Sequence, residues 1–246
     1  MVFGPIRSRR LGSSLGINVL PTKGKICNFD CIYCECGLNK DGLGDSRLPS
    51  AGELEDALRL KLEECAATGT PIDSITFSGD GEPTLNPGVP EMVDIAISLR
   101  DKYFPKAVVS VLSNATTLGD DRIFEALRKV DNPILKLDAP TDALVGLINR
   151  PVGKYSVRKV VEGMKRFEGN FVLQTMFLRS EGFDSSWPEV LGPWMDIVRE
   201  VRPREIMVYT IDRPVPVTGL QRLTASEMAS LVGPLMDEGY KIQIKG

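Results

Sequence analysis

The chain of 246 residues contains no histidine. Without an imidazole it cannot form a Ser-His-Asp or Cys-His nucleophile system, an HExxH zinc site, or an iron site made of two histidines and a carboxylate. Any chemistry must therefore rest on cysteine, carboxylate, lysine or hydroxyl groups, or on a bound cofactor.

An excess of charge of one sign is also lacking, since 30 Lys and Arg face 33 Asp and Glu and the net charge is −3. This balance argues against bulk nucleic-acid binding. No apolar run approaches the roughly 18 residues of a membrane span. The N-terminal arginines are followed by Gly and Ser rather than an apolar segment, so we expect no signal peptide. We predict a cytoplasmic protein without a membrane partner. In the reducing cytoplasm, clustered cysteines more often bind metal or take part in redox reactions than form disulfides.

Apolar segments alternate with amphipathic ones along the chain. The predicted strands are Gly16–Leu20, Ser74–Phe77, Ala107–Leu112, Ile134–Leu137, Asn170–Leu178 and Glu205–Thr210, with a short tail at Lys241–Ile244. The predicted helices are Ala51–Ala67, Val89–Lys102, Asp121–Val130, Ser156–Phe167, Pro188–Val201 and Ala225–Glu238. Such alternation implies parallel strands with right-handed crossovers.

Six strand–helix units in register are too few to close an eight-stranded barrel. We predict an α/β fold, a partial (β/α)6 TIM-like barrel with parallel strands, in preference to an open doubly wound sheet. We expect residues 1–246 to form a single domain, with the N-terminal segment 1–15 packing on or near the barrel mouth.

Three cysteines, Cys27, Cys31 and Cys34, follow the first predicted strand with the spacing C-x3-C-x2-C. Because the whole chain has only five cysteines, chance rarely places three so close together. A structural zinc ion needs four ligands, and the only further thiol nearby is Cys36. Three thiolates suit a four-iron cluster better, because the fourth iron then keeps an open position.

A second motif, Ser78-Gly-Asp-Gly-Glu-Pro-Thr84, follows the second predicted strand. Its glycines allow close backbone approach and its proline restricts the turn. Polar residues also end later strands, namely Asn114, Lys136 with Asp138, and Gln174. The carboxyl ends of parallel strands carry the functional site in such folds, although short polar residues there also serve as turns or helix caps.

With Tyr33 before the third cysteine, the cysteine loop resembles that of the radical SAM superfamily, enzymes that use S-adenosylmethionine (SAM). The resemblance implies that Cys27, Cys31 and Cys34 ligate a 4Fe–4S cluster whose free iron is chelated by SAM. It also implies contacts to SAM from Tyr33 beside the adenine, from Gly81, Glu82 and Pro83 at the ammonium, and from Asn114, Asp138, Lys136 and Gln174 at the ribose and carboxylate. Asp80 departs from the Gly pair that usually precedes the Glu.

The opening segment and both motifs also resemble the Fe–S oxidoreductase group related to wyosine-type tRNA-modifying enzymes. The implied activity is reductive cleavage of SAM to a 5′-deoxyadenosyl radical that abstracts hydrogen from a small-molecule, peptide or nucleoside substrate. The electron would come from a donor such as flavodoxin or ferredoxin. The alternatives are a tRNA-modifying enzyme of the wyosine type and a non-catalytic zinc or Fe–S binding module or electron carrier.

Other residues are weaker candidates for a role in the reaction. Cys36 is either a thiol or hydrogen-atom donor beside the cluster or a plain loop cysteine. Arg213, after the sixth predicted strand, is placed to reach the substrate. An N-terminal basic group either binds an anionic substrate or is solvated, and it comprises Arg7, Arg9 and Arg10.

Overall fold

The computed structural model describes residues 1–8, 11–21, 23–39 and 47–246. The backbone forms two compact units. The first consists of Met1–Cys27, Asn39–Ser113 and Thr117–Pro133, and the second of Asn28–Leu38, Asn114–Thr116 and Ile134–Gly246. The single domain over 1–246 stays a prediction.

The first unit contains β1 (Val2–Ser8), β2 (Gly12–Ile17), α1 (Ala51–Thr68), β3 (Ser74–Phe77), the short 3₁₀ helix η2 (Pro83–Leu85), α2 (Val89–Tyr103), β4 (Val108–Ser113) and α3 (Asp121–Lys129). Its strands follow the order β1-β2-β3-β4. Strand β1 is antiparallel to β2, whereas β2, β3 and β4 are parallel. The parallel strands therefore send their carboxyl ends to one edge, where the loops after β2 and β3 begin.

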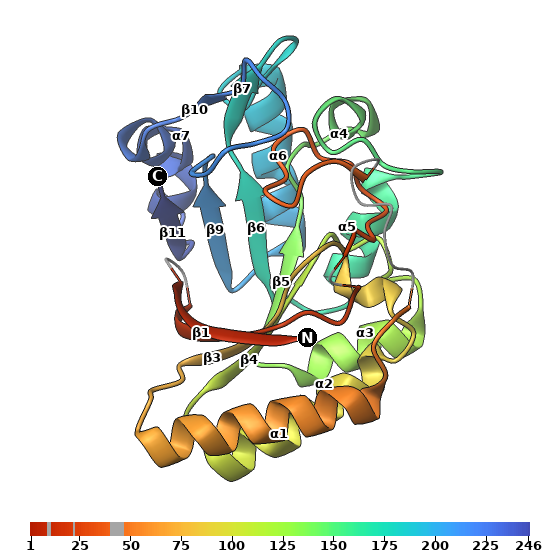
Figure 1. The fold of residues 1–246 in the computed structure, drawn as a ribbon. Coiled ribbons are helices and arrows are strands. Elements are labelled where there is room, and N and C mark those ends of the chain that lie inside the picture. Colours follow the sequence, from red (N-terminus) through yellow and green to blue (C-terminus); the bar gives the residue numbers. More distant parts are fainter. Residues whose placement is uncertain (9–10, 22, 40–46) are drawn as a thin grey trace. The chain divides into compact units, whose positions relative to one another are not determined.

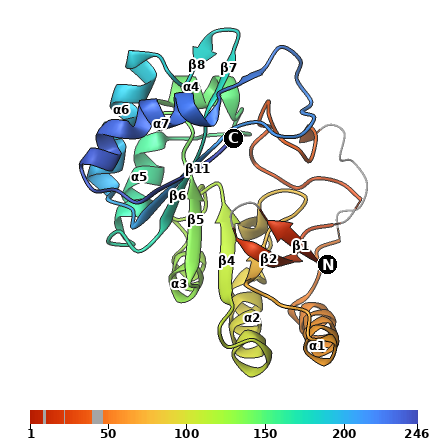
Figure 2. The ribbon, with the colours of Figure 1, turned by 90° about the vertical axis from the view of Figure 1, so that its left-hand side faces the viewer.

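Helix α1 shows how the first unit acquires its core. Leu54, Leu58 and Leu62 recur every four residues, so they share one helix face, and all three are fully buried. Burial of each leucine side chain contributes roughly 1.5–3 kcal/mol. Helix α1 packs beside α2, and α2 beside α3 (Figure 2). The helix begins at a capping box of Ser50 and Glu53.

The second unit contains α4 (Asp142–Ile148), α5 (Val157–Lys165), β6 (Val172–Met176), β7 (Leu178–Ser180), β8 (Phe183–Asp184), α6 (Pro188–Val201), β9 (Glu205–Tyr209), β10 (Gln221–Arg222), α7 (Ala225–Asp237) and β11 (Ile242–Lys245). Strand β5 (Asn132–Lys136) begins in the first unit and ends in the second. Strands β5, β6, β9 and β11 run parallel in that order (Figure 1).

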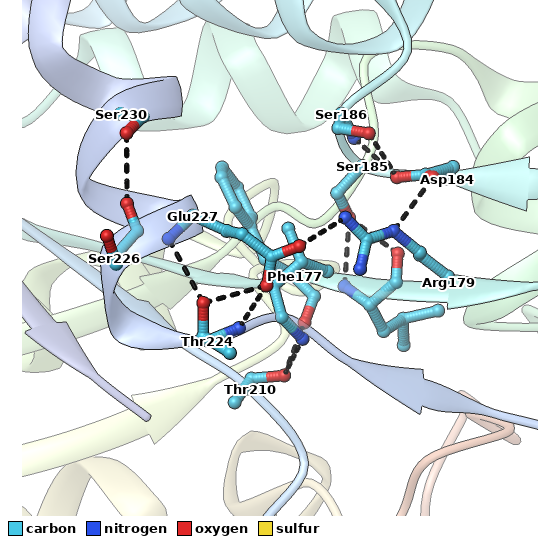
Figure 3. Close-up of polar contacts among 12 residues, drawn as sticks. Phe177, Arg179, Asp184, Ser185, Ser186, Thr210, Thr224, Ser226, Glu227 and Ser230 are labelled. Carbon is cyan, nitrogen blue, oxygen red and sulfur yellow. Dashed lines mark hydrogen bonds and ion pairs between the residues drawn. The ribbon is translucent and has the colours of Figure 1, made fainter.

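A small antiparallel sheet of order β10-β7-β8 also belongs to the second unit. Arg179 of β7 links it to α7, because its guanidinium pairs with Asp184 at 3.0 Å and with Glu227 at 2.9 Å (Figure 3). Glu227 also completes a capping box with Thr224 at the start of α7. One arginine thus fixes both a strand pair and a helix terminus.

The predicted alternation of strands and helices is confirmed, with several differences in detail, among them the unpredicted strands β8 and β10. The N-terminal segment forms β1 and most of β2, and β2 ends at Ile17 because the chain turns at Asn18, whose side chain accepts from Leu20 N. The predicted strand Asn170–Leu178 is divided between β6 and β7. Helix α4 was not predicted, because it is only seven residues long.

Over the described residues, no helix is both long and apolar enough to cross a membrane.

Candidate functional site

The cysteine loop of the second unit, Asn28–Leu38, folds into consecutive turns. Cys34 N donates to Cys31 O and Gly37 N donates to Cys34 O, each over 3.1 Å. Cys31 is buried, Cys34 is half-buried and Cys36 is exposed. The loop therefore offers thiols in three environments, and burial raises the pKa of the Cys31 thiol to about 11.

The turn that ends α4 holds this loop by backbone hydrogen bonds. Asp30 N donates to Asn149 O over 2.9 Å, and Ile32 N donates to Ile148 O over 3.0 Å. In the opposite direction, Val152 N donates to Asn28 O over 2.8 Å. The end of the unpredicted helix α4 thus fixes the backbone conformation of the loop around Cys31.

Cys31 borders a cluster of polar side chains centred on Asp138, which comprises Tyr33, Lys136, Asp138 and Asn149. Asp138 Oδ2 accepts from Tyr33 Oη and, over 2.7 Å, from Asn149 Nδ2. Its Oδ1 accepts from Met176 N over 2.8 Å and pairs with Lys136 Nζ at 3.4 Å. Burial and the Asp138 charge raise the pKa of Tyr33, so the phenol stays protonated and donates.

Lys136 lies between two aromatic rings within this cluster. Its Nζ is 5.1 Å from the ring centre of Tyr33 and 5.0 Å from that of Tyr209, and it donates to Tyr209 Oη over 2.5 Å. Burial acts to lower the pKa of Lys136, but the attractions of Asp138, Tyr209 and Cys31 together with the hydrogen bond to Tyr209 outweigh this effect, and the pKa is raised. The site therefore contains a half-buried cation.

Gln174 of β6 pairs in register with Lys136 of β5, so both side chains lie on the same face of the parallel strands. Gln174 is only 6% exposed, and its Nε2 has no hydrogen-bond partner among the described residues. A buried amide donor without a partner is costly, which favours a ligand that accepts from it.

Asn114 acts as a turn residue in the structure. Its Oδ1 accepts from Thr116 N and from Thr116 Oγ1, at 3.1 and 2.7 Å, and its Nδ2 donates to Asn28 Oδ1 over 2.7 Å. Asn114 therefore ties the turn after β4 to the residue that follows Cys27. Its predicted SAM contact stays a prediction.

In the first unit, the Gly81-Glu82-Pro83 turn pairs with the residue before Cys27. Ile26 N donates to Asp80 O over 3.0 Å, and Glu82 N donates to Ile26 O over 2.9 Å. Gly81 has φ +139°, and a Cβ there would lie 1.8 Å from Ile26 O. Only glycine permits this approach of the two backbones.

The carboxylate of Glu82 is buried and caps η2. Glu82 Oε1 accepts from Thr84 N over 3.1 Å and from Thr84 Oγ1 over 2.6 Å. Thr84 Oγ1 is also 2.6 Å from Thr117 Oγ1. Pro83 is the first residue of η2, where its fixed φ suits a helix start. The motif thus forms a rigid turn, while its predicted contact with the SAM ammonium stays a prediction.

The weaker candidates lie in exposed positions. Arg213 pairs with Glu35 at 3.1 Å, between the loop after β9 and the cysteine loop of the same unit. Both side chains are well exposed, so the pair contributes little stability. Arg7 lies on β1, whereas Arg9 and Arg10 lie outside the described residues.

A sequence profile described as the radical SAM superfamily matches residues 22–178 of the chain. This match extends over more than half of the sequence and includes both motifs. The chain belongs to the radical SAM superfamily.

Similar relatives and solved structures provide further comparisons. The chain is 30% identical over 219 residues to a UPF0026 protein of Helicobacter pylori, covering 87% of this chain and 67% of that protein. A radical SAM methyltransferase from Sphaerobacter thermophilus has a TM-score of 0.70 at 15% identity, over 94% of this chain and 65% of that one. Streptococcus suis SuiB bound to S-adenosylmethionine has a TM-score of 0.62 at 14% identity, over 94% of this chain and 45% of that one.

These likenesses show the fold. The predicted class, an α/β half-barrel with mostly parallel strands, is confirmed. The chain spans about two thirds of the length of the H. pylori protein and of the methyltransferase. The resemblance to the wyosine-related group stays a prediction.

The residues of this radical SAM protein fit a 4Fe–4S cluster with SAM by their chemistry. The cysteine loop offers thiols, the ligands that such clusters require. The half-buried Lys136 and the buried Gln174 offer donors to a polar ligand. Among the described residues, no group of three or more His, Cys, Asp or Glu side chains is placed to hold a metal ion.

Proposed function

We propose that the protein is a radical SAM enzyme that cleaves SAM reductively and abstracts hydrogen from a substrate. When bound, a 4Fe–4S cluster would supply the electron that releases methionine and a 5′-deoxyadenosyl radical from SAM. The C-x3-C-x2-C loop carries the proposal, because it lies within the matched profile and places Cys31 against a buried polar cluster.

Each part of the site has a proposed task. Cys27, Cys31 and Cys34 hold the cluster, and the turn at Gly81 keeps the chain before Cys27 in place. Asp138 fixes the Tyr33 ring by its hydrogen bond, so the ring is preorganised for stacking beside an adenine. Lys136 and Gln174 donate to acceptor groups of SAM, and the burial of Gln174 limits the access of water to these contacts.

We further propose a cytoplasmic protein that receives its electron from a flavodoxin or ferredoxin and acts on a small molecule, a peptide or a nucleoside. The solved SuiB, whose fold is similar, is described with a precursor peptide bound. A reducing compartment keeps the thiols of the loop available for iron.

The test is anaerobic reconstitution of the purified chain with iron and sulfide, followed by SAM and dithionite. We expect about four iron atoms per chain and release of 5′-deoxyadenosine. Cys31→Ala should lose most of the iron and of the cleavage. Cys65→Ala is the matched control, because Cys65 is also a buried cysteine but lies on α1.

Two outcomes would contradict the proposal. Iron well below four per chain together with tight zinc binding would favour the zinc-binding module. A full cluster that cycles between redox states without forming 5′-deoxyadenosine would favour the electron carrier. Cleavage retained by Cys31→Ala would refute the ligand assignment.

A further inference from the structure

Asn149, the residue that ends α4, brings Cys31 and the buried polar cluster together. Its Nδ2 lies 3.4 Å from Cys31 Sγ, 2.7 Å from Tyr33 Oη and 2.7 Å from Asp138 Oδ2, so its two N–H groups are shared among three acceptors. The residue is 1% exposed. One amide therefore contacts a proposed cluster ligand, the proposed adenine neighbour and the carboxylate that orients it.

The backbone of Asn149 is fixed on both sides, so the position of its amide is well defined. Asn149 N donates to Val145 O over 2.8 Å and closes the last turn of α4. Asn149 O accepts from Asp30 N over 2.9 Å, directly beside Cys31. Because the side chain and the cysteine loop share this anchor, the distance between Asn149 and Cys31 is set by local backbone geometry.

We propose that Asn149 is a positioning residue that makes the proposed cluster easier to reduce. An N–H donor to a ligand sulfur stabilises the more electron-rich, reduced state, and hydrogen bonds to sulfur are among the determinants of cluster potentials. The inference rests on the proposed function, since it requires a cluster on Cys31. Nothing in the cysteine motif itself points to Asn149, which lies 118 residues further along the chain.

The neighbouring charges explain why this donor is an amide. An aspartate at position 149 would place a second carboxylate against Asp138, and like charges in a buried site repel. A lysine would need to bury a second cation beside Lys136. A neutral amide donates to sulfur, phenol and carboxylate without adding charge.

The test is Asn149→Leu, which nearly preserves side-chain volume and removes the donor. Both wild type and variant are reconstituted anaerobically, and the midpoint potential is measured by a redox titration followed by electron paramagnetic resonance. Loss of one hydrogen bond worth about 1 kcal/mol corresponds to about a fivefold change in the reduction equilibrium, or about 40 mV toward more negative potential. Asn170→Leu is the control, since Asn170 contacts Arg204 outside the cysteine loop.

The outcomes separate the two proposals. If the wild type forms no four-iron cluster, the proposed function fails. If the wild type forms it and Asn149→Leu has the same potential with the same iron content, this inference is wrong. Asn149→Ser provides a second variant should the leucine variant not fold, and the same negative shift is expected. Folded Asn149→Leu and Asn149→Ser variants that both lose the cluster would also overturn the inference, because Asn149 would then be needed to hold the cluster rather than to set its potential.

Discussion

Gly81 is the glycine of the first unit at which an added methyl group should be most destabilising. A Cβ at Gly81 would lie 1.8 Å from Ile26 O and 2.5 Å from Ile26 C, both backbone atoms. Neither atom belongs to a side chain that could rotate away. Gly81→Ala must therefore separate the turn from the segment that leads into Cys27.

The free energy of unfolding that Gly81→Ala should lose follows from two costs. At φ +139°, an alanine is in a region used essentially by glycine alone, which costs about 2 kcal/mol. Separation of the segments also breaks the hydrogen bonds Ile26 N to Asp80 O and Glu82 N to Ile26 O, at about 1 kcal/mol each. The lower entropy of the unfolded alanine chain offsets these costs by about 1 kcal/mol. We expect a net loss of about 3 kcal/mol, a large part of the typical 5–15 kcal/mol.

Urea unfolding of the metal-free chain, followed by circular dichroism, measures this loss. Gly153→Ala is the control for strain alone, because Gly153 has φ +91° but nothing lies within 4 Å of the position that a Cβ would take there. Gly119→Ala controls for the change of residue type, since Gly119 has neither strain nor a neighbour within 4 Å. The expected order of destabilisation is Gly81, then Gly153, then Gly119. A Gly81→Ala variant no less stable than Gly153→Ala would refute the steric reasoning.

Three further predictions concern the second unit. Hydrogen bonds from Thr224 and Arg179 lower the pKa of Glu227 to about 2. The stability that the Glu227 carboxylate contributes is therefore complete above the unfolded pKa of about 4.3 and is lost as the pH falls toward 2. In Glu227→Gln the urea midpoint should depend less on pH between these values. Thr224→Ala should cost about 1 kcal/mol in urea unfolding, because it removes the cap of α7, and an unchanged midpoint would contradict the capping role. Lys136→Met should lower the free energy of unfolding by about 3 kcal/mol, because the buried Asp138 loses its partner. Restored stability in the double variant with Asp138→Asn would confirm that cause, whereas additive losses would argue against it.

The parts predictable from sequence are those that depend on local patterns. The leucines of α1 repeat with helical spacing, and the core-facing side of the helix follows from that repeat. The cysteine spacing and Tyr33 could be recognised as a radical SAM motif because these residues lie on one short loop and need no tertiary information. The glycine of the Gly81 turn could likewise be recognised, since such a turn favours residues that tolerate positive φ.

The partners of the strand-end residues could not be predicted in the same way. The contact of Asp138 with SAM stays a prediction, whereas its protein partners are known only from the structure, which surrounds it with Tyr33, Asn149, Lys136 and the backbone of Met176. Helix α4 and Asn149 were missed altogether. The signal was present, because Thr141 caps a segment that buries Val145 and Ile148, but a helix this short is a weak pattern.

The sequence by itself determined the family, the order of strands and helices, and the spacing of the cysteine motif, because motifs and hydrophobic periods are encoded by neighbouring residues. Only the tertiary structure decided that the end of α4 lies against the cysteine loop and that an amide donates to Cys31. Those contacts join residues more than a hundred positions apart. They arise when the parallel strands bring their carboxyl ends to one edge, and no local pattern encodes which side chains meet there.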